Sequence, residues 1–237
     1  MTEAKSLIYS LNRKIDRLNT ENKRHLKIVD LCSALTEAQY YLLKDRIQHI
    51  EKDKRNRYEL RQLEIKEHRE DVVVSNKVST IRIPDNLYRD LGIRIIASKR
   101  GCGKKEIPLT KMETQDTGKS LDNPFWKSSF GWEQVFGDVA GGYLYIYNGT
   151  DFKVEGAIID YIRGPGEIHC PSLVRSPEEY VDWNGVRQVA DTAWELDDLV
   201  KEGINLAAMM LTRDLGDYKE FQLQLSNNIQ TEQINKL

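Results

Sequence analysis

Apolar side chains recur with helical spacing at the start of the chain. They fall three or four positions apart over residues 2–18 and again over residues 23–50, and the polar run Asn19-Thr20-Glu21-Asn22 separates the two stretches. The short break predicts an antiparallel helical hairpin. Tyr40 and Tyr41 widen the apolar stripe of the second helix, so we expect these two tyrosines to meet neighbours on a further side of it.

Residues 51–70 interleave basic and acidic side chains, and only Leu60 and Leu63 give them an apolar edge. Binding to phosphate needs net positive charge, which this balanced run lacks. A solvated helix held by charge pairs four residues apart therefore explains the pattern better than an arm that binds nucleic acid.

After residue 71 the pattern changes to that of β-strands. Strands are predicted at residues 72–74, 78–83, 92–97, 143–147 and 152–161. Between them we expect a helical turn at 87–91, a Gly- and Lys-rich loop at 98–105 and a polar helix near 112–121. Asn148-Gly149 is a strong signal for a two-residue turn, so the strands before and after it are predicted to pair as a hairpin.

The helical pattern returns from about residue 186 to residue 215, where Gly216 is placed to end the helix. Residues 217–237 are mostly polar, with the isolated apolar side chains Phe221, Leu225, Ile229 and Ile234. Ordering such a tail costs about 1–2 kcal/mol per residue, so we expect it to be extended or loosely helical until a partner covers it.

Together these patterns predict an α+β fold. It would consist of an N-terminal helical hairpin, a small antiparallel β domain, and a long C-terminal helix with an extended tail. The corresponding regions are residues 1–70, 71–185 and 186–237.

Composition narrows the class of protein. The chain is 40% hydrophobic and 30% charged, which is typical of globular proteins. A net charge of −2 gives no general attraction to nucleic acid or acidic membranes, and no stretch approaches the ~20 apolar residues of a membrane span. Residues 1–70 carry excess basic charge and residues 176–217 excess acidic charge, which is either a basis for head-to-tail stacking or ordinary variation between solvated faces.

The chemistry-bearing residues predict neither an enzyme nor a cofactor site. Cys32, Cys102 and Cys170 are odd in number and widely spaced, which favours reduced thiols in a cytoplasmic setting, and the N-terminus lacks a signal peptide. The run 98–105 lacks the glycine and the hydroxyl residue of a phosphate-binding loop. His169-Cys170 could supply two metal ligands, but no second pair has zinc spacing.

Two groups of residues are candidates for contacts with other molecules. Phe125, Trp126 and Trp132 lie close together in a loop context, where they are either core or an interface. Glu195, Asp197 and Asp198 lie in the expected C-terminal helix, where they would face a DNA channel or a basic partner.

The order of segments resembles that of a known class of virion proteins. The features that carry the resemblance are NPFWKSSFGWEQVF before YLYIYNGTDF, a strand ending in IIDYIRGPGEI, the helix DTAWELDDLVKEGINLAAMMLTRDL and a Gln- and Asn-rich tail. In this order the chain is similar to structural proteins of crAss-like tailed phages of Bacteroidales, particularly the ring or adaptor proteins stacked under the portal in the head–tail connector.

The resemblance implies a non-catalytic subunit of a closed ring, expected to be twelve-fold, that surrounds the DNA channel. Its partners would be its own copies, the portal and adjacent ring or tail proteins, with packaged DNA nearby and no membrane. It would be made in the host cytoplasm and located in the virion, and its C-terminal segment would reach a neighbouring subunit. The alternatives are another tail or baseplate component, or a phage enzyme of DNA metabolism.

Overall fold

The computed structural model describes residues 2–18, 26–75, 77–112, 127–175 and 180–214. The chain divides into two compact units. The helical unit consists of residues 1–62 and 165–237, and the sheet unit consists of residues 63–164. The two ends of the chain thus belong to the same unit, and the sheet unit is inserted between them.

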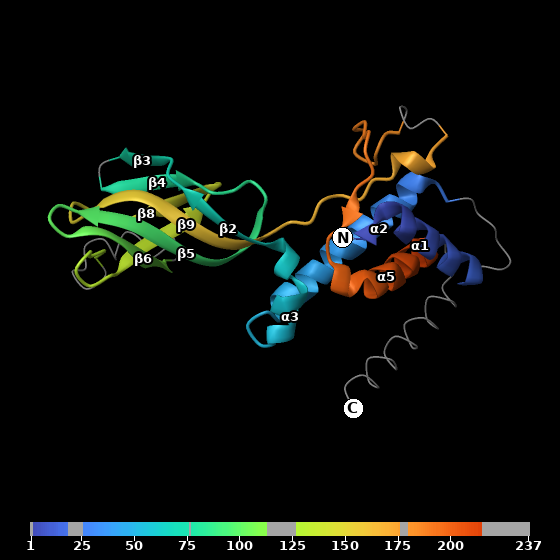
Figure 1. Cartoon of the computed structure of the whole chain (residues 1–237), viewed down its shortest axis with the longest axis horizontal. Coiled ribbons are helices and arrows are strands. Elements are labelled where there is room, and N and C mark those ends of the chain that lie inside the picture. The colour runs from blue at the N-terminus through green and yellow to red at the C-terminus, as the bar shows by residue number, and fades with distance from the viewer. Residues whose placement is uncertain (1, 19–25, 76, 113–126, 176–179, 215–237) are drawn as a thin grey trace. The chain divides into compact units, whose positions relative to one another are not determined.

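The helical unit is built on the helices α1 (Ala4–Leu18), α2 (Ile28–Gln48) and α5 (Val200–Asp214), with the short helix α3 (Lys54–Glu59) (Figure 1). Helix α5 contacts both α1 and α2. Two short strands, β1 (Thr2–Glu3) and β10 (Ala193–Trp194), pair antiparallel and join the start of the chain to the segment before α5. Single turns of 3₁₀ helix lie at Pro171–Leu173 and Asp197–Leu199, and a third, Arg61–Leu63, lies where the chain passes into the sheet unit.

The helical periodicity at the N-terminus correctly predicted two helices, α1 and α2. Leu7, Ile8 and Leu11 of α1 and Leu31 and Leu35 of α2 are fully buried, as the spacing of three and four requires. Burial of this stripe against α5 makes the helices part of one core.

The sheet unit contains strands β2 (Glu64–Arg69), β3 (Val72–Ser75), β4 (Val78–Arg82), β5 (Leu87–Lys99), β6 (Gly103–Lys111), β7 (Val135–Ala140), β8 (Tyr143–Ile146) and β9 (Lys153–Arg163). They form one sheet in the order β2-β9-β5-β6-β7-β8-β4-β3. The β6–β7 pair is parallel and the other neighbours are antiparallel.

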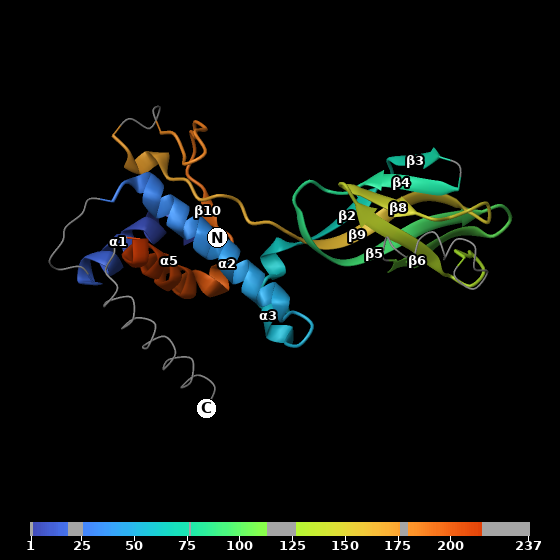
Figure 2. The same cartoon turned by 180° about the vertical axis from the view of Figure 1, so that it is seen from behind.

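This sheet curls so that its two halves enclose a common core. Strands β3 and β4 approach β9, from which they are far removed in the strand order, and Figure 2 shows the two layers. Buried side chains from both halves meet between them, among them Ile81, Ile95, Leu144 and Ile159. Register shifts within the long strand β5 are the irregularities by which a sheet bends.

The fold class predicted from the sequence is therefore wrong. In place of a small antiparallel β domain there is an eight-stranded curled sheet with a parallel pair. The predicted hairpin at Asn148-Gly149 does not form, because β8 pairs with β4 and β7 whereas β9 pairs with β2 and β5. The turn exists, but it leads the chain from one part of the sheet to another.

The charged run 51–70 is mostly not a helix. Only Lys54–Glu59 is α-helical, and Glu64–Arg69 forms the edge strand β2, where Ile65 packs on the sheet core. Residues 87–91, predicted as a helical turn, belong to β5. Of the predicted loop 98–105 only residues 100–102 connect β5 to β6, and the rest are paired strand residues. Pairing along a sheet outweighs the helical tendency of these polar residues.

The long C-terminal helix is also a wrong prediction. Helix α5 begins at Val200, fourteen positions after the expected start at 186. Trp194 is fully buried, and a Cβ on Gly203 would lie 2.1 Å from its ring, so the segment before α5 turns back against the helix. The tail 217–237 and most of the predicted helix near 112–121 lie outside the described residues.

Candidate interaction surface

A tight hairpin over residues 180–188 stands out in the helical unit. The backbone N–H of Asp182 donates to the carbonyl of Val186 at 2.9 Å, and that of Gly185 donates to the carbonyl of Asp182 at 3.0 Å. Val181 and Arg187 form an antiparallel bridge. Gly185 has φ +80°, a left-handed conformation that closes this type of turn and favours glycine.

The Asp182 carboxylate stabilises the hairpin through three hydrogen bonds. It accepts the backbone N–H groups of Asn184 at 2.9 Å and Val186 at 2.8 Å, and the side-chain amide of Gln188 at 2.9 Å. The Gln188 bond, followed by the two backbone bonds, holds the pKa of Asp182 below its ordinary value. At neutral pH the carboxylate is therefore ionised and accepts all three hydrogen bonds.

This well-bonded hairpin presents apolar side chains to solvent. Trp183 is 55% exposed, Val181 and Val186 of the hairpin are exposed as well, and Val189, which directly follows the hairpin, is 78% exposed. We call Val181, Trp183, Val186 and Val189 the hairpin surface. Exposed clusters of large apolar residues mark contact sites, and tryptophan is the residue most enriched in the energetic centres of interfaces.

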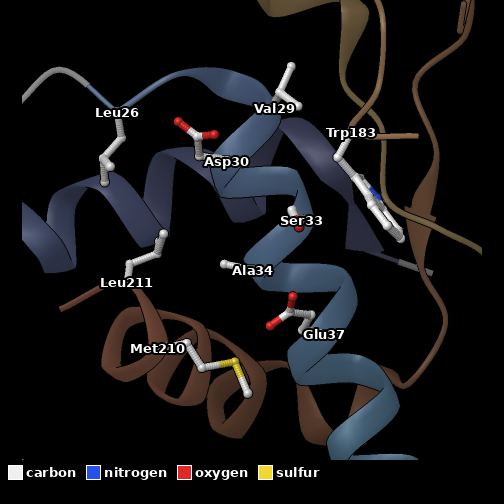
Figure 3. Close-up of a pocket in the computed structure, with 9 residues that line it drawn as sticks. All are labelled: Leu26, Val29, Asp30, Ser33, Ala34, Glu37, Trp183, Met210 and Leu211. Atoms are coloured by element: carbon white, nitrogen blue, oxygen red, sulfur yellow. The ribbon is translucent and has the colours of Figure 1, made fainter. Parts of the chain in front are cut away.

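A pocket of about 320 Å³ adjoins Trp183 within the same unit (Figure 3). Helix α5 contributes Met210 and Leu211, and the first turns of α2 contribute the remaining wall together with Leu26. The carboxylates of Asp30 and Glu37 lie at this lining. The pocket is thus an apolar depression with acidic groups, next to the hairpin surface.

Two cysteines near the hairpin, Cys32 and Cys170, are buried. Burial raises the pKa of the Cys32 thiol to about 11 and also raises the pKa of Cys170. Because the thiolate is the reactive form, burial makes both thiols weaker nucleophiles than an exposed cysteine. Cys102 lies exposed in the β5–β6 connection.

The predicted aromatic contacts are only partly within the described residues. Trp132 is 72% exposed, in a tight turn closed by the bridge between Ser129 and Gln134. Phe125 and Trp126 lie outside the described residues, as do Phe221, Leu225, Ile229 and Ile234. Their part in an interface stays a prediction.

On α2 the two tyrosines differ. The Tyr40 hydroxyl donates to the carbonyl of Pro165 at 2.9 Å, so this side chain holds the connecting segment of its own unit. Tyr41 is more exposed than Tyr40. Tyr41 is therefore the more suitable of the two for contact with another molecule.

The acidic residues predicted to face a channel or partner have contacts within the chain. Glu195 accepts the backbone N–H of Gly166 at 2.8 Å, and Asp197 accepts the Gln62 side chain at 3.0 Å. Asp198 lies 3.9 Å from Arg61, and both of these side chains are exposed. Asp198 is thus the most accessible of the three, although none lies in an α-helix.

Sequence reasoning missed the hairpin surface, although a signal was present. Asn184-Gly185 is a turn dipeptide flanked by Trp183 and valines, the composition of a short hairpin. Because Val186 and Val189 also fit the spacing of the helix expected from residue 186, this run was interpreted as the start of that helix.

Comparisons with known proteins identify no family for the chain. No protein-family model matches the chain, and no curated protein sequence matches it. Within the part of the chain that the structure describes, no helix combines the length and apolarity that a bilayer crossing needs.

Proposed function

We propose that the chain is a non-catalytic structural subunit of a tailed-phage virion. Copies of it would close into a ring, expected to be twelve-fold, in the head–tail connector below the portal. Further copies, the portal and adjacent ring or tail proteins would be its neighbours. Packaged DNA would pass through the ring without sequence-specific contact.

The observation that supports this proposal best is the hairpin surface. Its backbone is fixed by the Asp182 carboxylate, so the exposed Trp183 is presented on a preorganised support. A preorganised apolar surface loses little conformational entropy on binding, which favours a protein partner. The order of sequence segments that resembles connector proteins is the second support, and it suggests which kind of partner is involved.

Ring closure needs two different patches on each subunit. A head-to-tail contact joins one surface of a copy to another surface of the next, and it forms a closed ring when the rotation closes. In this proposal the hairpin surface is one of the two patches. Trp132, also well exposed but in the sheet unit, is available for the second contact or for an adjacent ring.

Quantitative mass spectrometry of purified virions tests the role. A ring subunit should be present at a copy number comparable to that of the portal, and chemical cross-links should join it to the portal or to a neighbouring ring protein. A protein cross-linked only to distal tail or baseplate components would overturn the connector position. Absence from virions, together with abundance in infected cells, would overturn the structural role and favour an enzyme.

A further inference from the structure

Three side chains with metal-ligating atoms converge beneath the hairpin. Glu167, His169 and Asp182 each bring one such atom, and these atoms lie within 4.8 Å of one another. Glu167 and His169 are two residues apart in the segment before the hairpin, and Asp182 belongs to the hairpin itself. His169 is only 6% exposed, Asp182 is equally buried and Glu167 is half-buried.

Among the described residues the imidazole of His169 makes no ring-nitrogen hydrogen bond, and its one polar contact is a long ion-pair distance to Glu167. Its Nδ1 is buried and has no hydrogen-bond partner among the described residues. Its Nε2 lies 3.6 Å from the nearer carboxylate oxygen of Glu167, which is too long for a hydrogen bond. Buried polar atoms are nearly always paired, so a buried imidazole with one unbonded nitrogen, whose other nitrogen faces a carboxylate at 3.6 Å, points to a cation between these groups.

Neighbouring amides hold both carboxylates in place without using all their lone pairs. The Asn184 side-chain amide lies 3.3 and 3.4 Å from the two oxygens of Glu167, and Gln188 donates to Oδ2 of Asp182 at 2.9 Å. An ionised carboxylate offers about four acceptor positions. Amides that orient ligating carboxylates from outside are typical of the surroundings of metal sites.

We propose that Glu167, His169 and Asp182 bind one divalent transition-metal ion, with Zn²⁺ as the best fit. One imidazole nitrogen with two carboxylate oxygens is a mixed donor set that suits Zn²⁺, whereas Ca²⁺ and Mg²⁺ prefer oxygen alone. Atoms bound to Zn²⁺ at about 2.1 Å in a tetrahedron stand roughly 3.4 Å apart, so small side-chain shifts complete the site.

The ion would have a structural consequence. It ties the segment at Glu167 and His169 to the hairpin that carries Trp183, and its charge offsets the two carboxylates. Metal binding would therefore add to the stability of a hairpin that the Asp182 hydrogen bonds already hold. The inference rests on side-chain geometry alone and does not depend on the connector role.

The test uses the full chain carrying Cys102→Ser, so that the exposed thiol does not compete for metal. Chelator-treated protein is titrated with Zn²⁺ by calorimetry and with Co²⁺ by absorption spectroscopy. We expect one ion per chain, a higher melting temperature on Zn²⁺ addition and a Co²⁺ spectrum without a thiolate charge-transfer band.

The decisive variants are His169→Gln and Glu167→Gln. Each should weaken Zn²⁺ binding by about tenfold or more. His68→Gln and Glu106→Gln, which change the same residue types at exposed positions on β2 and β6, should bind as the parent does. Because Glu167 is half-buried, its variant provides the test even if His169→Gln fails to fold.

Three results would overturn the proposal. They are no saturable Zn²⁺ binding by the parent, unchanged affinity in Glu167→Gln, or a Co²⁺ spectrum that shows sulfur ligation. If the protein binds Zn²⁺ as expected but is absent from virions, the metal site stands and the connector role falls.

Discussion

The chain has two Asn-Gly turns, one in each unit, and their asparagines are used in opposite ways. Asn148, in the sheet unit, is buried, accepts from the Ser79 hydroxyl at 3.0 Å and donates to the carbonyl of Phe152 at 3.1 Å. Asn184, in the helical unit, is exposed, and its side-chain amide lies 3.3 and 3.4 Å from the two oxygens of the Glu167 carboxylate. The first turn is therefore part of a core, and the second presents a surface.

This difference shows that the same dipeptide can serve stability or contact. At Asn148 the side chain adds to the strand pairing, because it bonds Ser79 of β4 and the carbonyl of Phe152 just before β9. At Asn184 the turn is held by Asp182 instead, so the outward side chains are not needed for folding. The exposed side chains of such a surface can be substituted without loss of the fold.

The largest effect is expected from Asn148→Ala. This change removes both hydrogen bonds and leaves the Ser79 hydroxyl and the Phe152 carbonyl buried without their partner, which costs about 2–3 kcal/mol. Denaturant unfolding of the full chain measures the loss. Asn184→Ala is the matched control and should change stability by less than about 0.5 kcal/mol. Equal losses of unfolding free energy in the two variants would contradict the proposed difference between the two turns.

Asp182→Ala comes next. It removes the acceptor of two backbone N–H groups and of Gln188, at a cost of about 1–2 kcal/mol at this partly solvated hairpin. Hydrogen exchange of the Asn184 and Val186 amides should accelerate markedly, while exchange in the sheet unit stays as in the wild type. Continued protection of both amides would show that the hairpin does not depend on this carboxylate.

Acid should have the same local effect on the wild-type hairpin. The folded pKa of Asp182 is lowered below its ordinary value of 3.8, so its stabilising contribution is fully present above that pH. The contribution is lost as the pH falls through the folded value. In chelator-treated protein, exchange protection of the Asn184 amide should therefore be flat from pH 7 to about pH 4, after correction for the intrinsic rate, and fall below that. A decline already at pH 6 would implicate another group.

The two turn glycines should behave alike. Gly149 has φ +58° and Gly185 has φ +80°, and a Cβ on either would meet nothing closer than 3.9 Å. Alanine at each position costs only the strain of the left-handed conformation, about 1 kcal/mol. Denaturant unfolding of Gly149→Ala and Gly185→Ala should give similar losses. A much larger loss for one of them would reveal packing that the space around these glycines does not explain.

The sequence predicted the parts of the fold that depend on local spacing. Leu7, Leu11, Leu31 and Leu35 repeat with a period that only a helix buries, so α1 and α2 were found. The edge strand at Ile65 was missed because its interleaved charges also suit a helix, and pairing with β9 decides the outcome.

The remaining errors concern long-range contacts. Which strands pair around Asn148 depends on partners distant in sequence, which a turn dipeptide does not encode. The start of the last helix was misplaced because Val186 and Val189 have helical spacing, yet both are exposed. For the candidate metal site, His169 was recognised as a possible ligand, but Asp182 reaches it only through the hairpin.

The most direct test of the central claim, that the hairpin surface is an assembly contact, is incorporation of Trp183→Ala into virions. Trp183 is 55% exposed, so the variant should still fold, with only a small fall in melting temperature, whereas loss of an interface tryptophan costs about 2 kcal/mol or more, roughly a 30-fold weaker contact. Tyr88→Ala, an exposed aromatic of the sheet unit, is the control. The account predicts that Trp183→Ala protein is folded and soluble but strongly depleted from purified virions, with Tyr88→Ala present at normal copy number. Incorporation of Trp183→Ala at the wild-type level would contradict it.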